Sequence, residues 1–175
     1  NAIDAAKNVV LEGTQGLMLS LYHGTYPYVT SRDTSAAAVC SESGVGPSRV
    51  DTVLIVYKSF ITRVGTGELP GELSREEALR RGWFERAAGT GRERRSAPFD
   101  FDLARKVARI NGATEAAVTK LDVLYPICSG AKSFDELPRE AKEFTTKVEK
   151  AAGIPVTIIG TGPGALDIID RRSSA

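Results

Sequence analysis

Hydrophobic residues at helical spacing predict a helix in the second half of the chain. Leu103, Val107 and Ile110 recur every three or four residues, preceded by Asp100 as a candidate cap. Gly112 follows the pattern as a stop signal, because glycine favours the left-handed conformation that ends helices. The pattern therefore predicts one amphipathic helix between two polar boundaries.

Two further helices are predicted from patterning and capping. Residues 138–152 are amphipathic, with Phe144 and Val148 on the apolar face. Ser74 is followed three residues later by Glu77, which is the capping-box pattern at the start of a short helix.

Continuous apolar runs predict buried strands. Residues 116–124 form such a run, with Thr119, Lys120 and Asp122 as interruptions, and this predicts a parallel strand with polar residues at its carboxyl end. Residues 156–159 are predicted to form the last core strand. A glycine loop at 160–164 and a short helix over 165–170 are expected to follow it.

The first part of the chain is less periodic. Residues 7–12 are predicted to form a strand that leads into a glycine turn at 13–16. Residues 17–50 are rich in Gly, Ser, Thr and Pro, and so long a loop-rich segment in a compact domain is typical of a functional region. The apolar positions within 53–60 predict a helix or a strand.

The alternation of strand, loop and helix predicts an α/β fold with a mostly parallel sheet, flanking helices and ligand-binding loops at strand ends. The 42% hydrophobic content is sufficient for a sizeable core. Because no repeat or sharp linker divides the chain, residues 1–175 are predicted to be part of one domain.

Charge and composition exclude several classes of protein. The 23 basic and 22 acidic residues nearly cancel, so no field of the whole chain favours nucleic acid or an anionic membrane. No apolar run reaches the roughly 18 residues of a spanning helix, and no signal peptide is recognised, so a cytoplasmic protein is expected. Cys40 and Cys128 are predicted to be reduced, buried thiols. His23, the single histidine, is predicted to be structural rather than a metal ligand.

Residues 89–95 predict a local anion-binding loop. Two glycines that tolerate positive φ are followed by Arg92, Arg94 and Arg95, whose planar guanidinium groups suit carboxylates and phosphates. The alternative is a solvated basic turn with no ligand.

Five more segments carry polar residues and glycines in a defined order. With residues 89–95, their combined order resembles that of the adenylosuccinate synthetases, from about Val9 to the end of the chain. Between Leu124 and Gly153 the chain is compact, as in the shorter archaeal members. The five segments are Glu12-Gly13-Thr14-Gln15-Gly16, residues 23–31, residues 62–67, residues 119–124 and residues 160–163.

The resemblance implies an enzyme of purine nucleotide biosynthesis with a P-loop-like fold. Such an enzyme uses GTP and Mg²⁺ to ligate L-aspartate to inosinate (IMP), giving adenylosuccinate, GDP and phosphate. A cytoplasmic homodimer is implied as well. A viral-type synthetase that joins aspartate to dGMP is the enzymatic alternative, and a non-catalytic nucleic-acid-binding module is the alternative from another class.

The resemblance also assigns roles to residues. The positions matched to IMP are Gln15, Thr30, Val64, Gly65 and Arg92. The positions matched to aspartate are Thr90 and Arg92. The positions matched to GTP are Arg94, Lys120, Leu121, Asp122, Gly160, Thr161 and Gly162.

Elementary chemistry agrees with the guanine assignment. The Asp122 carboxylate can accept hydrogen bonds from guanine N1–H and the 2-amino group, a donor pair that adenine lacks. The alternative for Asp122 and Lys120 is a surface ion pair, and for Gln15 and Thr30 it is ordinary hydrogen bonding within turns.

Some family features differ or are absent. Gly89 replaces a threonine and Glu93 interrupts a run of arginines, so Glu93 is expected to point away from the aspartate pocket or to pair with Arg94. The family's Gly-Asp-Glu-Gly-Lys-Gly-Lys loop with its catalytic aspartate, and its catalytic histidine, are not found. The chain is therefore expected to be a C-terminal portion without catalytic residues or Mg²⁺ ligands, and inactive alone.

Overall fold

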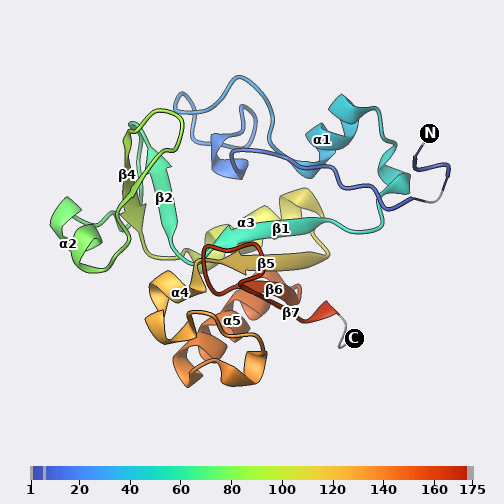
Figure 1. Cartoon of the computed structure of the whole chain (residues 1–175). Helices are drawn as coiled ribbons and strands as arrows, with labels where there is room; N and C mark the ends of the chain where they lie inside the picture. The colour runs from blue at the N-terminus through green and yellow to red at the C-terminus, as the bar shows by residue number, and fades with distance from the viewer. Residues whose placement is uncertain (1, 6, 173–175) are drawn as a thin grey trace. The chain divides into compact units, whose positions relative to one another are not determined.

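The computed structural model describes residues 2–5 and 7–172. Residue contacts divide the chain into two compact units, Asn1–Val53 and Leu54–Ala175 (Figure 1). Each unit has its own local structure.

The first unit consists mainly of loops with three short helical segments: η1 (Leu17–Leu19), α1 (Ala36–Ser43) and η2 (Pro47–Arg49). Ser35 caps α1 by accepting a hydrogen bond from the N–H of Ala38, and Gly44 ends it with φ 71°. The prediction of a strand at 7–12 is wrong. A strand needs a partner for its N–H and C=O groups, and none pairs with this segment within the described residues.

The second unit contains a four-stranded sheet in the order β1-β5-β6-β7. The first three strands are parallel, and the fourth is antiparallel to its neighbour, which confirms the predicted α/β fold with a mostly parallel sheet. The strands are β1 (Leu54–Lys58), β5 (Glu115–Thr119), β6 (Val156–Gly160) and β7 (Ile168–Asp170).

Strand β7 replaces the helix predicted over 165–170. The N–H of Gly164 donates to Asp167 Oδ2, and the N–H of Asp167 donates to the Gly164 carbonyl, so a tight turn sends the chain back beside β6. The free edge of β6 supplies hydrogen-bond partners for the backbone of residues 168–170. This pairing makes the segment a strand.

Helices α3 (Phe101–Asn111) and α5 (Arg139–Ala152) pack against each other and confirm the predicted amphipathic patterns. Asp100 caps α3 by accepting a 2.9 Å hydrogen bond from the N–H of Leu103. Their apolar faces join the sheet in one core that includes Phe144, Val148 and Val118. Shorter helical segments lie between these elements: α4 (Leu121–Leu124), η3 (Pro126–Cys128) and η4 (Phe134–Glu136).

A second sheet, antiparallel and in the order β2-β4-β3, follows the carboxyl end of β1 (Figure 1). The arginine run was predicted as a loop, but its second half lies in strand β4. Its polar sequence does not indicate a strand, and the backbone pairing with β2 and β3 makes it one. Helix α2 confirms the short helix predicted from Ser74 and Glu77, since Ser74 Oγ accepts from the N–H of Glu77, although the Glu77 carboxylate pairs with Arg80 and Arg81. These elements are β2 (Ile61–Val64), α2 (Arg75–Arg80), β3 (Glu85–Arg86) and β4 (Glu93–Ala97).

Both cysteines are free thiols, as predicted, although only Cys128 is buried and Cys40 is half-buried. Burial raises the pKa of Cys128 to about 11, so this thiol stays protonated and inert at neutral pH. Among the described helices, none combines the length and the apolar character that a membrane crossing requires.

Candidate nucleotide-binding site

The parallel strands of the first sheet end side by side at Lys58, Thr119 and Gly160. Ser59 joins two of these ends, because its N–H donates to the Thr119 carbonyl at 3.0 Å and its Oγ donates to the Lys120 carbonyl at 2.7 Å. A methyl group added at Gly160 would lie 3.4 Å from the Cα of Thr119, so the two loops that follow β5 and β6 are close neighbours. This edge is where open α/β sheets bind ligands.

Residues 120–122 leave β5 through a sharp change of backbone direction. Lys120 has φ 61°, a left-handed conformation that ends the strand and starts α4. The side chain of Leu121 is fully buried and anchors the turn in the core. Asp122 is half-buried, and no described residue donates a hydrogen bond or pairs with its carboxylate. Asp122 is therefore available to a ligand, while Leu121 can contribute only backbone groups.

The glycine loop after β6 is fixed from within. Thr161 is fully buried, and its Oγ1 donates to the Ala131 carbonyl at 3.0 Å, while its N–H donates to the Asp167 carbonyl at 2.8 Å. A methyl group at Gly162 would meet Asp167 Oδ2 at 2.7 Å. The hydroxyl of Thr161 is occupied by this hydrogen bond and is not free to bind a ligand. The loop can therefore contribute mainly its backbone groups.

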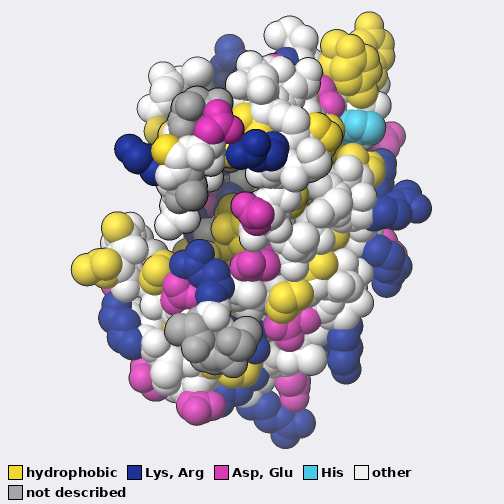
Figure 2. Space-filling view, turned by 90° about the vertical axis from the view of Figure 1, so that its right-hand side faces the viewer, with side chains coloured by type: hydrophobic (Ala, Val, Ile, Leu, Met, Phe, Trp, Pro, Cys, Tyr) yellow, Lys and Arg dark blue, Asp and Glu magenta, His cyan; other side chains and the backbone are white. Residues whose placement is uncertain are grey.

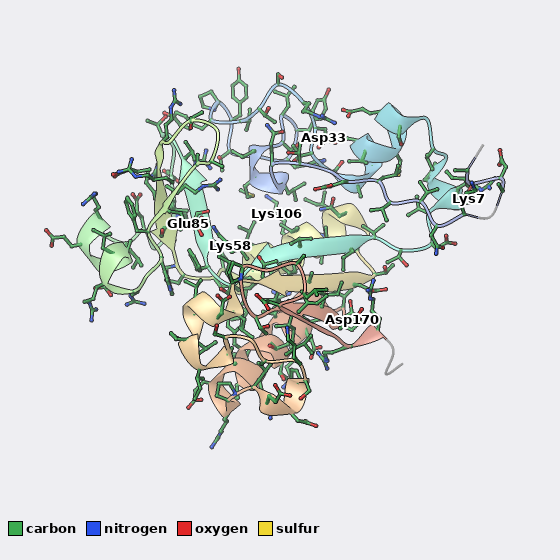
Figure 3. The ribbon with its side chains drawn as sticks, in the orientation of Figure 1. Lys7, Asp33, Lys58, Glu85, Lys106 and Asp170 are labelled. Carbon is green, nitrogen blue, oxygen red and sulfur yellow. The ribbon has the colours of Figure 1, made fainter. Side chains whose placement is uncertain are left out.

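A group of four charged side chains and one threonine, all half-buried except the exposed Lys120, lies where the two sheets meet. We call it the Glu85 cluster, and its members are Lys58, Thr62, Glu85, Arg94 and Lys120. Glu85 Oε2 lies 2.9 Å from Lys58 Nζ and 3.9 Å from Arg94 Nε, and Glu85 Oε1 lies 3.1 Å from Lys120 Nζ. Thr62 Oγ1 accepts from Lys58 Nζ at 2.5 Å and from Arg94 Nη1 at 3.5 Å. Figure 3 shows Glu85 and Lys58 at this junction.

The cluster holds three cations and one carboxylate. Burial lowers the pKa of Lys58, and the hydrogen bond and charge of Glu85 oppose that effect without cancelling it. Burial alone would raise the pKa of Glu85, but the hydrogen bond from Lys58 and the charges of Lys58 and Lys120 outweigh it and hold that pKa below its ordinary value. The carboxylate of Glu85 is therefore charged at neutral pH, and three basic side chains surround this one anion.

Lys58 and Glu85 were not predicted as site residues. Lys58 ends an apolar strand in the same way as Thr119 does, and that placement was the available signal in the sequence. Glu85 carries no such signal, because it lies in a strand of two residues and meets its partners only through the pairing of sheets. The alternative ion pair between Lys120 and Asp122 is wrong, since the partner of Lys120 is Glu85.

The β3–β4 hairpin presents Thr90 and Arg92 at its exposed tip. Thr90 Oγ1 accepts from the N–H of Arg92 at 3.4 Å, and within the described part of the chain the guanidinium of Arg92 has no partner. Glu93 is held by Arg75 at 3.2 Å and by Arg86 at 2.8 Å. Of the two alternatives for Glu93, pairing with Arg94 is wrong, and an orientation away from the aspartate pocket stays a prediction. Glu93 does not occupy the guanidinium of Arg92, which is open to a ligand.

Arg95 fixes the loop that contains Val64 and Gly65. Its guanidinium donates to the carbonyls of Gly65 at 2.8 Å and Gly67 at 2.7 Å, and it makes two 2.9 Å hydrogen bonds with Glu72. Gly65 has φ 83°, which suits glycine and few other residues. Arg95 is therefore a structural brace, and the alternative of a purely solvated arginine turn is wrong for this residue.

In the first unit, Gln15 and Thr30, each matched to IMP by the resemblance, are in contact. Gln15 Nε2 donates to Thr30 Oγ1 at 3.1 Å, although these residues are far apart in sequence, and Gln15 has φ 71°. Asp33 supports the same loops by accepting hydrogen bonds from Ser20 Oγ and Ser35 Oγ, both at 2.7 Å. Burial would raise the pKa of Asp33, but these hydrogen bonds outweigh it and lower the pKa.

The Mg²⁺ that the family resemblance implies takes oxygen ligands, among them carboxylates. No group of three or more His, Cys, Asp or Glu side chains in residues 2–5 and 7–172 is arranged to hold a metal ion. Where the protein holds Mg²⁺ stays a prediction.

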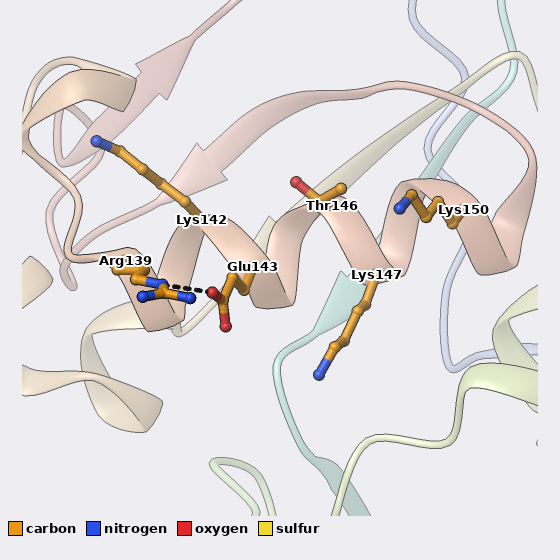
Figure 4. Close-up of a pocket in the computed structure, with 6 residues that line it drawn as sticks. All are labelled: Arg139, Lys142, Glu143, Thr146, Lys147 and Lys150. Atoms are coloured by element: carbon orange, nitrogen blue, oxygen red, sulfur yellow. Dashed lines mark hydrogen bonds and ion pairs between the residues drawn. The ribbon is translucent and has the colours of Figure 1, made fainter.

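A hollow on the outer face of α5 is unrelated to the strand ends (Figure 4). It is lined only by side chains of this one helix, and Arg139 Nε pairs with Glu143 Oε1 at 2.7 Å there. No convergent groups from other elements enter the hollow, so it has the character of a solvated helix face. The lining residues are Arg139, Lys142, Glu143, Thr146, Lys147 and Lys150.

Known proteins match the chain at the levels of family, sequence and fold. The family model described as adenylosuccinate synthetase matches residues 1–127. The adenylosuccinate synthetase of Thermococcus onnurineus is 54% identical over 174 residues, which are 99% of this chain and 51% of that protein. That of Methanocaldococcus jannaschii is 51% identical over 173 residues, 99% of this chain and 50% of that protein.

Two solved structures share the fold. The fully ligated adenylosuccinate synthetase from Plasmodium falciparum matches with a TM-score of 0.90 and 27% identity, over 98% of this chain and 52% of that one. The cyanophage S-2L succinoaminodeoxyadenylate synthetase, bound to dGMP and dATP, matches with a TM-score of 0.70 and 22% identity, over 91% of this chain and 45% of that one. The chain spans about half the length of these proteins. Because the family model covers most of its residues, the chain belongs to the adenylosuccinate synthetase family.

Proposed function

We propose that the full-length protein ligates L-aspartate to IMP with GTP as the energy donor, forming adenylosuccinate, GDP and phosphate. In this reaction GTP phosphorylates the 6-oxygen of the purine, and the amine of aspartate then displaces phosphate. The residues of this chain bind and orient the three substrates and stabilise their charges, which lowers the barrier by positioning and electrostatics. The acid and base groups belong to the other half of the protein.

The available carboxylate of Asp122 is the observation that carries this proposal. It follows β5 at the ligand-binding edge of the sheet, next to the glycine loop after β6. A carboxylate in this place suits the paired donors of guanine and would repel the acceptor N1 of adenine. This favours GTP over ATP.

The groups proposed for the other substrates have matching chemistry. Arg92 has an unpaired guanidinium that can bind a carboxylate of aspartate with two parallel hydrogen bonds, and Thr90 lies beside it. Gln15 and Thr30 offer an amide and a hydroxyl in contact with each other, which suits the base and the 5′-phosphate of IMP. We propose that Val64 and Gly65 contribute backbone groups near the ribose.

The family resemblance supports three further parts of the proposal. The enzyme acts as a homodimer, resides in the cytoplasm and requires Mg²⁺. Light scattering of the purified full-length protein tests the first, and dialysis against a chelator followed by an activity assay tests the third. A monomeric active enzyme, or full activity after chelation, would contradict the corresponding part.

The activity is tested with the full-length protein and the three substrates, with adenylosuccinate measured by chromatography. Product should form only when IMP, aspartate and GTP are all present, and replacing GTP with ATP or IMP with dGMP should abolish most of it. Turnover of dGMP without IMP turnover would favour the viral-type reaction. The 175-residue chain alone should form no product, because a lack of acid–base groups by itself forfeits a typical factor of about 10² to 10⁴.

A nucleic-acid-binding module is the weaker alternative. Lys and Arg side chains are interspersed with Asp and Glu on the face drawn in Figure 2, instead of forming one basic stripe. Binding of mixed-sequence DNA or RNA should therefore be no tighter than for other near-neutral proteins at physiological salt. Submicromolar binding with a steep salt dependence would favour this alternative.

A further inference from the structure

We propose that Glu85 is a positioning residue for the nucleotide site, which acts by holding Lys120 and Arg94 with a single carboxylate. This inference rests on the proposed function, because Lys120 and Arg94 are the cations assigned to GTP. Glu85 itself need not touch the nucleotide.

The geometry gives each carboxylate oxygen of Glu85 its own partners. Oε1 lies 3.1 Å from the ammonium of Lys120, in a direction that does not satisfy hydrogen-bond geometry within the described chain. Oε2 lies 2.9 Å from the ammonium of Lys58 and 3.9 Å from Nε of Arg94. Glu85 is thus held firmly by Lys58 while it attracts the two nucleotide cations.

The partners of Glu85 come from different elements. Lys58 is the last residue of β1 and Lys120 follows β5 in the first sheet. Glu85 and Arg94 face each other across the β3–β4 pair in the second sheet. The carboxylate therefore joins the hairpin that carries Arg92 to the turn that carries Asp122. A substitution of Glu85 should therefore affect the binding of GTP more than the binding of IMP or aspartate.

Charge balance explains why the carboxylate cannot be replaced by a neutral group of the same shape. The cluster contains one anion among three cations, and the side chain of Glu85 is only 18% exposed. Arg94 Nε is buried, and no described residue accepts a hydrogen bond from it, so its orientation depends on the nearby negative charge and on Thr62. Without that charge, Lys58, Lys120 and Arg94 repel one another in a partly desolvated place.

The principal variant is Glu85→Gln in the full-length enzyme, which keeps the shape of the side chain and removes its charge. The KM for GTP should rise about tenfold, while the KM for IMP changes little and the melting temperature falls only modestly. Glu77→Gln is the matched control, because Glu77 also pairs with two basic side chains, Arg80 and Arg81, but lies on α2. This control should leave all kinetic constants near those of the wild type.

A double-mutant cycle separates a positioning role from a general structural one. Lys120→Met should raise the KM for GTP by itself, and adding Glu85→Gln to that variant should raise it by less than about threefold more. Glu85→Asp keeps the charge on a shorter side chain and serves if the glutamine variant does not fold. It should raise the KM for GTP by an intermediate amount with the melting temperature retained.

Specific results would overturn the inference. If the wild type is active and Glu85→Gln leaves the KM for GTP unchanged, the inference is wrong. It is also wrong if Glu85→Gln raises this KM as much in the Lys120→Met variant as in the wild type. If the glutamine variant does not fold, an unchanged KM for GTP in Glu85→Asp would overturn it too. A wild-type enzyme that makes no adenylosuccinate with GTP would instead contradict the proposed function.

Discussion

The tip and the base of the β3–β4 hairpin differ in how their arginines are held. At the tip, Arg92 is exposed and has no partner within the described chain, whereas Arg94 and Arg95 at the base are half-buried and contact Glu85 and Glu72. All three residues lie within four consecutive positions of one sequence motif. Chemical identity therefore does not decide the role of an arginine, but the partners that the fold supplies do.

This difference has an energetic consequence. An exposed side chain without partners contributes little to folding, so its substitution usually changes the free energy of unfolding by less than about 0.5 kcal/mol. Removing one partner of a half-buried pair leaves the other charge desolvated and is costlier. Substitutions at the tip should therefore change mainly ligand binding, whereas substitutions at the base should also lower the free energy of unfolding.

The largest effect is expected at the tip. Arg92→Leu in the full-length enzyme should reduce kcat/KM for aspartate by about 2 to 4 kcal/mol, because a two-pronged contact to a carboxylate is lost. Steady-state kinetics measure this, and Arg80→Leu, an exposed arginine on α2, is the control. Equal kinetics for the two variants would identify Arg92 as an ordinary surface residue.

A smaller effect is expected beyond the hairpin, at the turn that the base contacts. Asp122→Asn should weaken the preference for GTP over ATP by about 1 to 3 kcal/mol, since an amide places a donor against a donor of guanine. The measurement is the ratio of kcat/KM for the two nucleotides. An unchanged ratio would remove Asp122 from the guanine site.

In the isolated chain, substitutions of Arg92 and Arg95 should change the free energy of unfolding by different amounts. Arg95→Met removes hydrogen bonds to Gly65, Gly67 and Glu72 and should lower the free energy of unfolding by about 1 to 2 kcal/mol. Arg92→Met should lower it by less than about 0.5 kcal/mol. Urea denaturation followed by the fluorescence of the single tryptophan, Trp83, measures both. Equal losses would break the distinction between tip and base.

The smallest effect concerns acid stability at the base. The folded pKa of Glu85 lies below its ordinary value of 4.5, so its contribution is present above that value and is lost as the pH falls through the folded pKa. The difference in unfolding free energy between wild type and Glu85→Gln should therefore shrink between pH 7 and pH 3, by less than about 1 kcal/mol because the group is partly solvated. A difference that grows on acidification would contradict the sign of this pKa shift.

Much of the fold was predictable because its signals are local. Helix α3 has its apolar spacing, its Asp100 cap and its Gly112 stop within one short segment, and α2 is marked in the same way by Ser74 and Glu77. Apolar runs mark β6 and β5, although β5 ends at Thr119 and the rest of the run predicted as a strand, 121–124, is the short helix α4. The order of the glycine and polar motifs indicated the family before any contact was known.

The remaining features depend on contacts between distant segments. Residues 7–12 have the composition of a strand but no partner in the described structure, whereas β7 and β4 become strands because partners are present. Lys58, Glu85 and Lys120 are separated by more than 25 positions in sequence and meet only when the two sheets are assembled. Local periodicity and capping determine helices and core strands because they act within a few residues. Backbone pairing and charge pairing over long separations are decided only by the tertiary structure, which sets the distances on which both depend.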